Sequence, residues 1–477
     1  MSEPFGNYAK AATAAATIAL GIALTGAVGT DAHAQSGETA VKQYDSGGVY
    51  EGEFKDGRQH GRGTFTLPGG YEYTGDWVDG KIEGQGRVKY PNGSIYEGAF
   101  KDGAPHGRGK ITYADGGSYD GEWVVGMIDG RGVAVYANGV RYEGQFKKSA
   151  NHGRGIMTRP NGYRYDGQWK DGNPHGRGSV RYADGSTYTG EFLDGVREGF
   201  GELRRDDGFT YVGEWRGGQI NGRGAATYAG GDKYEGEFLN GGRHGRGTAN
   251  YANGDVYVGL FSDSKQNGQG VLTAANGDVY DGQWVDDRFE GQGVARLADG
   301  RIVTGQFENF VLSGPGKIVM PDGGVYEGQW QNGAINGKGT FRLANGAVYE
   351  GQFEQGRING LGTIVYADGY RYQGSWKNGQ PHGQGEARFP NGGVYVGDFV
   401  EGRREGRGEF TQADGFSYDG EWLNNMIHGT GSATYANGDV YKGEFRDNKR
   451  HGQGEMTFVN GAVYSGLWVN GQRGTNE

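Results

Sequence analysis

The sequence contains no cysteine, which excludes disulfide bridges and thiolate metal sites. Proline is scarce, with 10 residues in 477, and apolar residues make up only 34%. Basic residues are not in excess, because the formal net charge is −10. Non-specific nucleic-acid binding needs a basic surface, so this charge argues against a nucleic-acid partner.

Glycine and aromatic residues are abundant instead. The 101 glycines and the polar composition are typical of disorder, but 31 Tyr, 21 Phe and 9 Trp are not. Aromatic rings provide more buried area than other side chains. We therefore predict an ordered, β-rich protein with an aromatic core.

The N-terminal segment has the pattern of an export signal. Residues 11–30 form an uncharged apolar run after Lys10, and Ala32 and Ala34 match the A-x-A form of a signal-peptidase site. We expect a signal peptide at 1–34, cleaved after Ala34, and a periplasmic location. The alternative is a membrane anchor formed by residues 11–30, which are long enough to span a bilayer.

One motif recurs every 23 residues. YEGEF at Tyr50 returns as YTGDW at Tyr73 and continues without insertion or deletion to YSGLW at Tyr464, giving nineteen starts. With the first Tyr as position 1, glycine fills position 3 in all nineteen repeats and positions 12, 14 and 21 in all eighteen complete ones. Position 5 is always Phe or Trp and holds every tryptophan of the chain. Such a fixed period indicates a repeat architecture.

A longer period lies above the 23-residue one. WVDGKIEGQG at Trp77 returns as WVDDRFEGQG at Trp284, 207 residues later, which is nine repeats. The sequence therefore predicts a nine-repeat block duplicated within the chain. The predicted divisions are a short leader at 35–49, repeats 1–9 at 50–256, repeats 10–18 at 257–463, and a terminal half repeat at 464–477.

Each repeat has the pattern of a β-hairpin. Positions 1, 3 and 5 alternate with polar residues, which is the period of a half-buried strand. Asn-Gly or Asp-Gly pairs between repeats, such as Asn92-Gly93, predict type I′ turns. The glycines at positions 3, 12 and 14 leave room for the rings. On the opposite face, we expect acids at position 4 to pair with arginines at position 13, as in Glu53 and Arg62.

The unit YxGxW/FxxGxxHGxGxxxxxxxG resembles the MORN (membrane occupation and recognition nexus) repeat, and YEGEFKDGRQHGRGTFTLPGG at 50–70 fits it closely. The resemblance covers residues 50–477. It implies an all-β protein, an elongated twisted array of about nineteen 23-residue β-hairpins. It also implies a protein that acts as a scaffold, dimerises, or attaches to membranes and their lipids.

Eight of the nine histidines occupy position 11 of the repeat, beginning with His60. Equivalent positions in adjacent hairpins are expected about 10 Å apart. Zinc ligands lie roughly 2.0–2.3 Å from the metal, so this column cannot share one. Other repeats carry Glu, Asp, Asn or Ser there. We interpret position 11 as a polar turn residue and predict no catalytic residue, metal site or cofactor.

The aromatic column admits two interpretations. The first is that its rings are the core, because so polar a chain has little else to bury. The second is an exposed strip that stacks on lipids or envelope glycans. The residues of that candidate strip are Tyr50, Trp77, Trp123, Trp169, Trp215, Trp284, Trp330, Trp376, Trp422 and Trp468.

One repeat, 303–325, departs from the pattern. Val303 replaces Tyr, Phe310 replaces the usual Gly, and Pro315 enters the second strand, where it removes a backbone donor. We predict a local hinge or a partner patch at these three residues.

No nucleophile, base or metal ligand set breaks the repeat, so the sequence argues against an enzyme. The leading hypothesis is an exported scaffold that binds a protein partner, or a second copy of itself, along an extended β-surface. The alternative is a module that binds membrane lipids or envelope glycans through the aromatic column.

Overall fold

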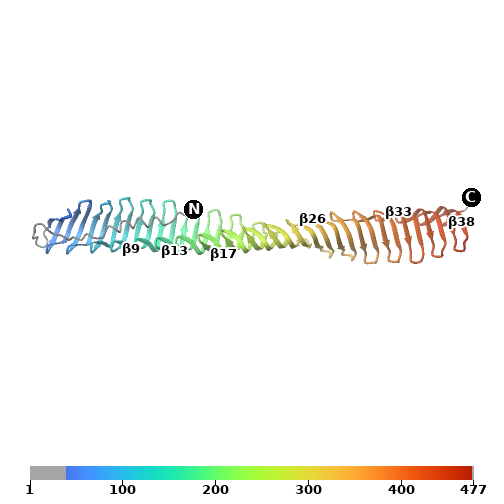
Figure 1. Ribbon diagram of the computed structural model, residues 1–477, viewed down its shortest axis with the longest axis horizontal. Helices are drawn as coiled ribbons and strands as arrows, with labels where there is room; N and C mark the ends of the chain where they lie inside the picture. Colours follow the sequence, from blue (N-terminus) through green and yellow to red (C-terminus); the bar gives the residue numbers. More distant parts are fainter. Residues whose placement is uncertain (1–38, 475–477) are drawn as a thin grey trace. The chain divides into compact units, whose positions relative to one another are not determined.

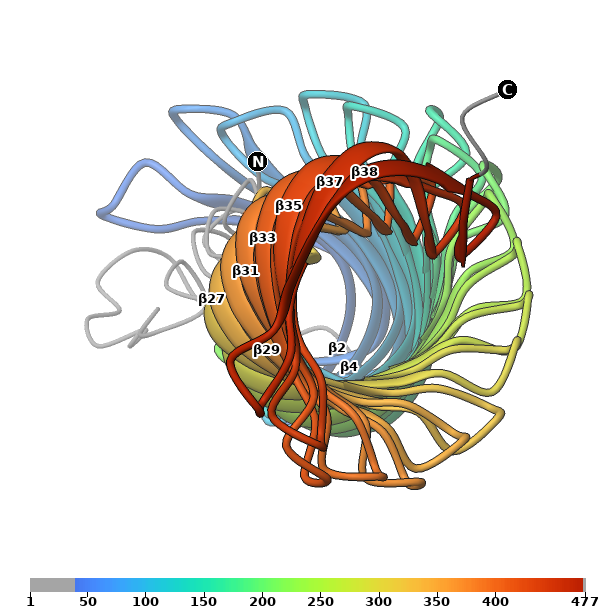
Figure 2. The same ribbon diagram turned by 90° about the vertical axis from the view of Figure 1, so that its right-hand side faces the viewer.

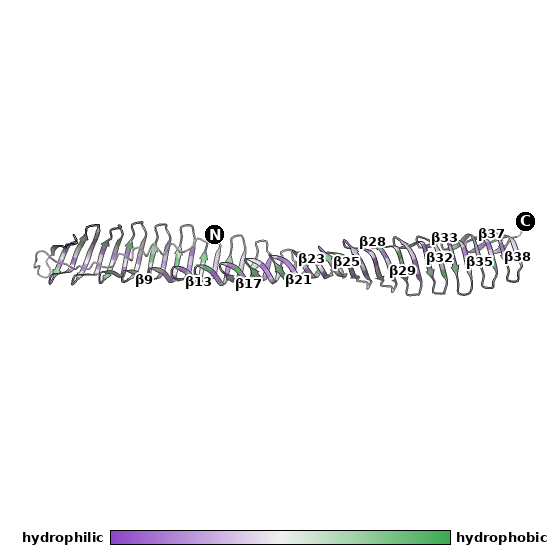
Figure 3. Ribbon diagram, in the orientation of Figure 1, coloured by the Kyte–Doolittle hydropathy of each residue, from purple (hydrophilic) through white to green (hydrophobic). Residues whose placement is uncertain are grey.

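The computed structural model describes residues 39–474, and every regular element in that range is a β-strand. The hydropathy pattern explains this, because hydrophilic and hydrophobic residues alternate along the strands (Figure 3). Their side chains alternate between exposed and buried, as in β2 (Val49–Lys55). The all-β prediction of antiparallel hairpin repeats is confirmed. The predicted signal peptide at 1–34, its cleavage site at Ala32 and Ala34, and the alternative anchor at 11–30 lie outside the described residues.

The chain divides into two compact units, which meet in sequence at Gly245 and Arg246 within strand β19 (Gly242–Asn250). In unit 1 each strand pairs antiparallel with its neighbour in sequence (Figure 1). The strands of unit 1 before β19 are β1 (Thr39–Gln43), β2 (Val49–Lys55), β3 (Arg58–Leu67), β4 (Tyr71–Val78), β5 (Lys81–Lys89), β6 (Ile95–Lys101), β7 (Ala104–Thr112), β8 (Ser118–Val124), β9 (Met127–Val135), β10 (Arg141–Lys147), β11 (Ala150–Thr158), β12 (Arg164–Lys170), β13 (Asn173–Arg181), β14 (Thr187–Leu193), β15 (Val196–Arg204), β16 (Thr210–Arg216), β17 (Gln219–Thr227) and β18 (Lys233–Leu239).

Unit 2 repeats the same antiparallel order, and its strands fan around the viewing axis in Figure 2, as expected for the twist of a β-sheet. The strands of unit 2 after β19 are β20 (Val256–Ser262), β21 (Lys265–Thr273), β22 (Val279–Val285), β23 (Arg288–Arg296), β24 (Ile302–Glu308), β25 (Val311–Val319), β26 (Val325–Gln331), β27 (Ala334–Arg342), β28 (Val348–Glu354), β29 (Arg357–Val365), β30 (Arg371–Lys377), β31 (Gln380–Arg388), β32 (Val394–Val400), β33 (Arg403–Thr411), β34 (Ser417–Leu423), β35 (Met426–Thr434), β36 (Val440–Arg446), β37 (Lys449–Thr457), β38 (Val463–Val469) and β39 (Gln472–Arg473).

The two turns of each repeat differ, and the type I′ turn is not where the sequence predicted it. It lies inside the repeat, at positions 7 and 8, where Asp56 and Gly57 have φ of 48° and 72°. At the Asn92-Gly93 pair between repeats only Gly93 has positive φ. There Tyr90 N–H donates to Ser94 O and Gly93 N–H donates to Tyr90 O, which makes a three-residue loop. The prediction for the loops between repeats was therefore wrong.

Each repeat also contains a β-bulge. In β2 and β3 the pairing jumps from Gly52 opposite Gly63 to Phe54 opposite Gln59, so the second strand holds two extra residues. Gly61, at position 12, lies in this bulge. Glycine at position 12 has φ between 58° and 113° in all eighteen complete repeats, a backbone conformation that other residues rarely adopt.

The bulge changes the role of the acid at position 4. It frees the amide at position 13, and the side chain at position 4 accepts a hydrogen bond from it, as Glu53 Oε1 does from Arg62 N–H at 3.2 Å. Glu53 therefore contacts the backbone of Arg62, and the predicted pairing of position 4 with position 13 forms between adjacent repeats instead. The guanidinium of Arg62 lies 3.5 Å from Asp76, the position 4 residue of the next repeat.

The rings at positions 1 and 5 form the core. Tyr96 contacts Phe100 of its own repeat and Trp123 of the next in edge-to-face geometry, with centroid separations of 5.0 and 5.1 Å. Its hydroxyl donates to Ala99 O at 2.9 Å. The ring lies over Gly98 and Gly109, where an added Cβ would overlap it. Each repeat therefore completes the packing of its neighbour, so stability is a sum of nearest-neighbour contacts.

Candidate functional surface

The residues of the candidate aromatic strip are buried. Tyr50 and all tryptophans except Trp330 have relative exposures between 0% and 5%, and Trp330 is half-buried. The members are Tyr50, Trp77, Trp123, Trp169, Trp215, Trp284, Trp330, Trp376, Trp422 and Trp468. An exposed strip is therefore not what these residues form, because the tryptophan rings pack edge-to-face against the position 1 tyrosines, as Trp77 does against Tyr50 and Trp123 against Tyr96.

The tryptophans also link adjacent repeats through hydrogen bonds. Trp123 Nε1–H donates to Gly109 O of the preceding repeat at 3.0 Å, and Trp169 makes the same bond to Gly155 O. Phenylalanine at position 5 can supply the ring but not this donor. The polar atom of the indole is thus used within the core.

Position 11 joins neighbouring repeats. In several repeats its side chain accepts a hydrogen bond from the backbone amide at position 7 of the next repeat: Asp102 N–H donates to Glu83 at 2.9 Å, and Asp79 N–H to His60 Nδ1 at 3.5 Å. Within the described chain, such a partner is lacking for the buried Nδ1 atoms of His152, His175, His428 and His451. His, Glu, Asp and Asn all offer an acceptor, which explains why they share the position. His60 therefore lies in the bulge and supports the neighbouring turn. Among residues 39–474, no cluster of His, Cys, Asp and Glu could hold a metal ion.

The departing repeat keeps its strands but changes its packing. Val303 pairs with Ile318 in the register of the other repeats. Because Val303 has no ring, Leu312 lies over Gly305 and Gly316 in its place. In the preceding repeat Phe289, which is fully buried, lies over Gly293 where a Tyr would normally lie.

The other two residues of the predicted hinge differ in effect. Phe310 has φ of 66°, which is strained for a bulky residue, and its ring contacts Tyr280 at 5.2 Å. Pro315 removes no hydrogen bond between strands. It occupies position 13, and in other repeats the amide at this position lies in the bulge and bonds to a side chain instead of the neighbouring strand. The disturbance extends to Trp330, the one tryptophan in the described chain whose buried Nε1–H lacks a partner.

We predict faster backbone hydrogen exchange in 303–325 than in the regular repeat 349–371. The missing ring, the strained Phe310 and the unpaired indole of Trp330 all lower the free energy of local opening. Exchange followed peptide by peptide by mass spectrometry measures this. Equal rates in the two repeats would show that 303–325 is not a hinge.

The face opposite the rings carries the exposed positions 2, 4, 13 and 15. In unit 1 position 13 is an exposed arginine in six repeats: Arg62, Arg108, Arg131, Arg154, Arg177 and Arg223. In one repeat Phe200 takes this place and is 58% exposed, beside Val212 at 40%. These two side chains and the arginines Arg154 and Arg177 line a shallow hollow of about 610 Å³.

Sequence reasoning missed Phe200 and Val212. The sequence did contain a clue to Phe200, because position 13 is arginine in nearly all the other repeats of unit 1. Single exposed apolar side chains are common, but contiguous ones mark interaction sites, so the neighbouring pair of Phe200 and Val212 is the informative feature. The exposed face, and not the aromatic column, is thus the candidate functional surface.

A chain of interdependent hairpins with a closed aromatic core and a varied outer face defines a repeat scaffold. The MORN repeat profile matches seventeen segments, and the chain belongs to the MORN repeat family. The matched residues are 50–70, 73–95, 96–118, 119–141, 142–162, 165–187, 188–210, 211–233, 234–256, 257–279, 280–300, 326–348, 349–369, 372–394, 395–416, 418–440 and 441–463. The departing repeat is unmatched. The family is generally non-enzymatic.

Comparison with curated proteins gave no match. Among solved structures, the TCP domain of SAS-4 (dCPAP) from Drosophila melanogaster, in complex with a proline-rich motif of Ana2 (dSTIL), has 13% identity. The match covers 41% of this chain and 87% of that chain at a TM-score of 0.20.

Two further solved structures have still lower TM-scores. The TCP10 domain of CPAP from Danio rerio has 13% identity and a TM-score of 0.12, and the match covers 66% of this chain and 99% of that domain. A virginiamycin B lyase from Staphylococcus aureus has 12% identity and a TM-score of 0.10, and the match covers 68% of this chain and 90% of the lyase chain. At these TM-scores none of the three likenesses bears on function.

Residues 39–474 contain no helix that is long and apolar enough to cross a membrane.

Proposed function

We propose that this chain is an exported, periplasmic scaffold that binds a protein partner through its outer face. The observation that carries the proposal is the exposed pair Phe200 and Val212 in a hollow beside Arg154 and Arg177. Aromatic and arginine residues are the side chains enriched in protein-binding surfaces. Export is supported by the signal-like segment at 1–34.

The residues that line the hollow indicate which chemical groups the partner would present. An apolar side chain on the partner would cover Phe200 and Val212. Polar groups of both charges would meet Arg154 and Arg177 and the acids that also line the hollow, Asp166, Glu191 and Glu202. The absence of a nucleophile that breaks the repeat favours a non-enzymatic role. No observation favours lipid or glycan stacking, because the rings of the column are buried.

Substituting Phe200→Arg tests this proposal without disturbing the core, since Arg is the usual residue at position 13. We expect crosslinking and pull-down from the protein's own envelope fraction to recover a partner with the natural chain and at least tenfold less of it with Phe200→Arg. The matched control is Leu361→Arg, at the same repeat position in unit 2 and 65% exposed. A partner retained by Phe200→Arg, or lost equally with Leu361→Arg, contradicts the proposed surface.

A further inference from the structure

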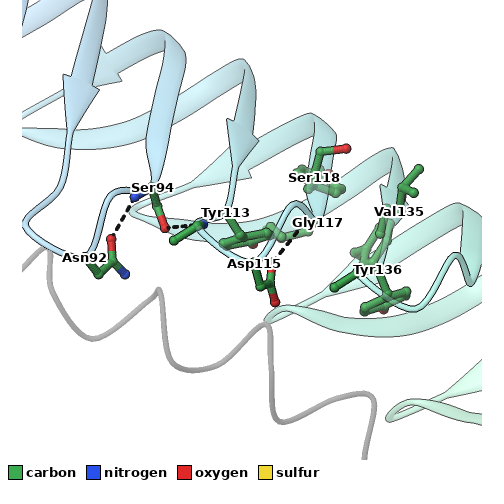
Figure 4. A pocket seen from close by; sticks show the side chains of 14 residues that line it. Asn92, Ser94, Tyr113, Asp115, Gly117, Ser118, Val135 and Tyr136 are labelled. Carbon is green, nitrogen blue, oxygen red and sulfur yellow. Dashed lines mark hydrogen bonds between the residues drawn. The ribbon is translucent and has the colours of Figure 1, made fainter.

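A cavity of about 250 Å³ opens on the ring-bearing face in unit 1. Tyr113 and Tyr136 contribute to its walls, and the buried side chains of Ile128 and Phe146 also line it. Figure 4 shows that most of its labelled lining residues come from successive loops between repeats, and that Ser118 and Val135 lie at the adjoining ends of β8 and β9. The cavity needs an explanation, because interiors leave few voids larger than a water molecule.

The explanation is a rule of size compensation between two repeat positions. Position 22 of one repeat faces position 16 of the next: a Cβ added at Gly48 would meet the ring of Phe65, and one at Gly393 the ring of Phe410. Where one member of a pair is Gly, Ala or Ser, the other is a ring or a large aliphatic side chain, except at Asp232/Ala249 and Asp278/Ala295, where an aspartate faces the alanine, and at Gly117/Ala134. The pairs that combine a ring with Gly or Ala are Gly48/Phe65, Phe209/Ala226, Gly324/Phe341, Tyr370/Ala387, Gly393/Phe410 and Phe416/Ala433.

Gly117 and Ala134 break this rule. They occupy positions 22 and 16, and within residues 39–474 they are the one such pair in which both members are Gly or Ala. Both line the cavity. The cavity therefore lies where a Phe or Tyr ring lies in the equivalent pairs.

The rim of the cavity is polar and built from ordered loop contacts. Ser94 N–H donates to Asn92 Oδ1 at 2.9 Å, and Gly117 N–H donates to Asp115 Oδ1 at 2.9 Å (Figure 4). The exposed carboxylate of Asp115 has a second oxygen that can accept a hydrogen bond from a ligand. An apolar interior with a carboxylate oxygen among the polar groups that line the cavity suits a ring that carries a donor.

We propose that the Gly117/Ala134 cavity binds an aromatic ring bearing a hydrogen-bond donor, such as a phenol or an indole. An apolar cavity of roughly 150 Å³ is enough to hold benzene, so this one has room for the substituent as well. The ring replaces the side chain that the repeat lacks, and its donor reaches Asp115. This inference does not rest on the proposed scaffold function.

Titration of the full chain with indole tests the proposal, read by calorimetry and by saturation-transfer NMR. We expect saturable binding by the natural chain and at least tenfold weaker binding by Ala134→Phe, which copies the Gly48/Phe65 pair. Because the new ring fills the void, the same variant should have a higher Tm. Gly117→Tyr, which copies Tyr370/Ala387, is the second filling variant in case the first does not fold.

The matched control is Ala226→Phe, where Phe209 already fills the space. It should lower Tm through overpacking and leave indole binding unchanged. A parallel titration with N-acetyl-tryptophanamide separates the two sources of the ring: binding by both probes indicates a side chain of a peptide, and binding by indole alone indicates a free aromatic molecule. No saturable binding by the natural chain, or equal binding by Ala134→Phe, overturns the proposal.

Discussion

Substituting Gly109→Ala is expected to destabilise its repeat by about 3 kcal/mol, at the upper end of the usual cost of overpacking. The new methyl would overlap the ring of Tyr96. That ring cannot move aside cheaply, because its hydroxyl bonds to Ala99 O and its edges contact Phe100 and Trp123. Native-state hydrogen exchange should show amides of 96–118 exchanging about 100-fold faster.

Gly103→Ala is the control for this experiment. Gly103 has φ of 83° but open space around its Cβ position, so the substitution costs only the left-handed backbone conformation, about 1–2 kcal/mol. Other repeats carry Ser149 and Asn448 at the same position with positive φ. If Gly109→Ala and Gly103→Ala accelerate exchange equally, the overlap with the ring is not what fixes glycine at position 14.

The sequence predicted the parts of the fold that depend on periodicity. Alternation at positions 1, 3 and 5 places Tyr50, Gly52 and Phe54 on one buried face, as observed. The ring column and its glycines at positions 3 and 14 follow from the same pattern. These features are local, because a two-residue period fixes which face a side chain occupies. The prediction that glycine at position 12 also leaves room for the rings was wrong, because Gly61 lies in the bulge and faces the side chain of Glu53.

The errors arose from the bulge, which periodicity does not reveal. Asp56-Gly57 and Asn92-Gly93 look alike in sequence, yet only the first forms a type I′ turn. The second strand has two extra residues between Gln59 and Gly63, and this offset determines that Asp56-Gly57 forms the two-residue turn. The extra residues also turn the amide of Arg62 towards Glu53, which is why the expected side-chain pair within the repeat is absent.

The two candidate sites were missed for a different reason. Each is a break in a column that runs through many repeats: Phe200 among arginines, and Gly117 opposite Ala134 among compensated pairs. The second break becomes visible only once the structure shows that positions 22 and 16 of adjacent repeats are in contact. In an array this regular, function is expected where one member differs from its equivalents and the fold is preserved.

Raising the pH from 10 to 12 is expected to unfold the protein cooperatively. Burial raises the pKa of Tyr326 to about 12, and burial followed by the Glu53 carboxylate raises that of Tyr50 to about 12. Other tyrosines whose pKa is raised to about 12, chiefly by burial, are Tyr71, Tyr113, Tyr136, Tyr211, Tyr234, Tyr349 and Tyr441.

The loss of stability at high pH follows from the different proton binding of the folded and unfolded chains. Above about pH 10 the unfolded chain releases its phenolic protons while the folded chain keeps them, so stability is complete below that pH and falls as pH rises towards 12. Each such tyrosine can remove up to about 1.4 kcal/mol per pH unit. A handful is enough to offset the roughly 5–15 kcal/mol by which ordinary domains are stable.

Parallel titrations by phenolate absorbance and far-ultraviolet circular dichroism measure this. The two signals should change together between pH 10 and 12, because the hydroxyls of buried tyrosines such as Tyr142, which donates to Gln145 O at 2.9 Å, ionise only when their repeats open. The chain unfolded in guanidinium is the control, and its tyrosines should ionise at their ordinary pKa of about 10. Full phenolate absorbance with the β-sheet signal intact would mean that the position 1 hydroxyls are accessible and do not hold the core together.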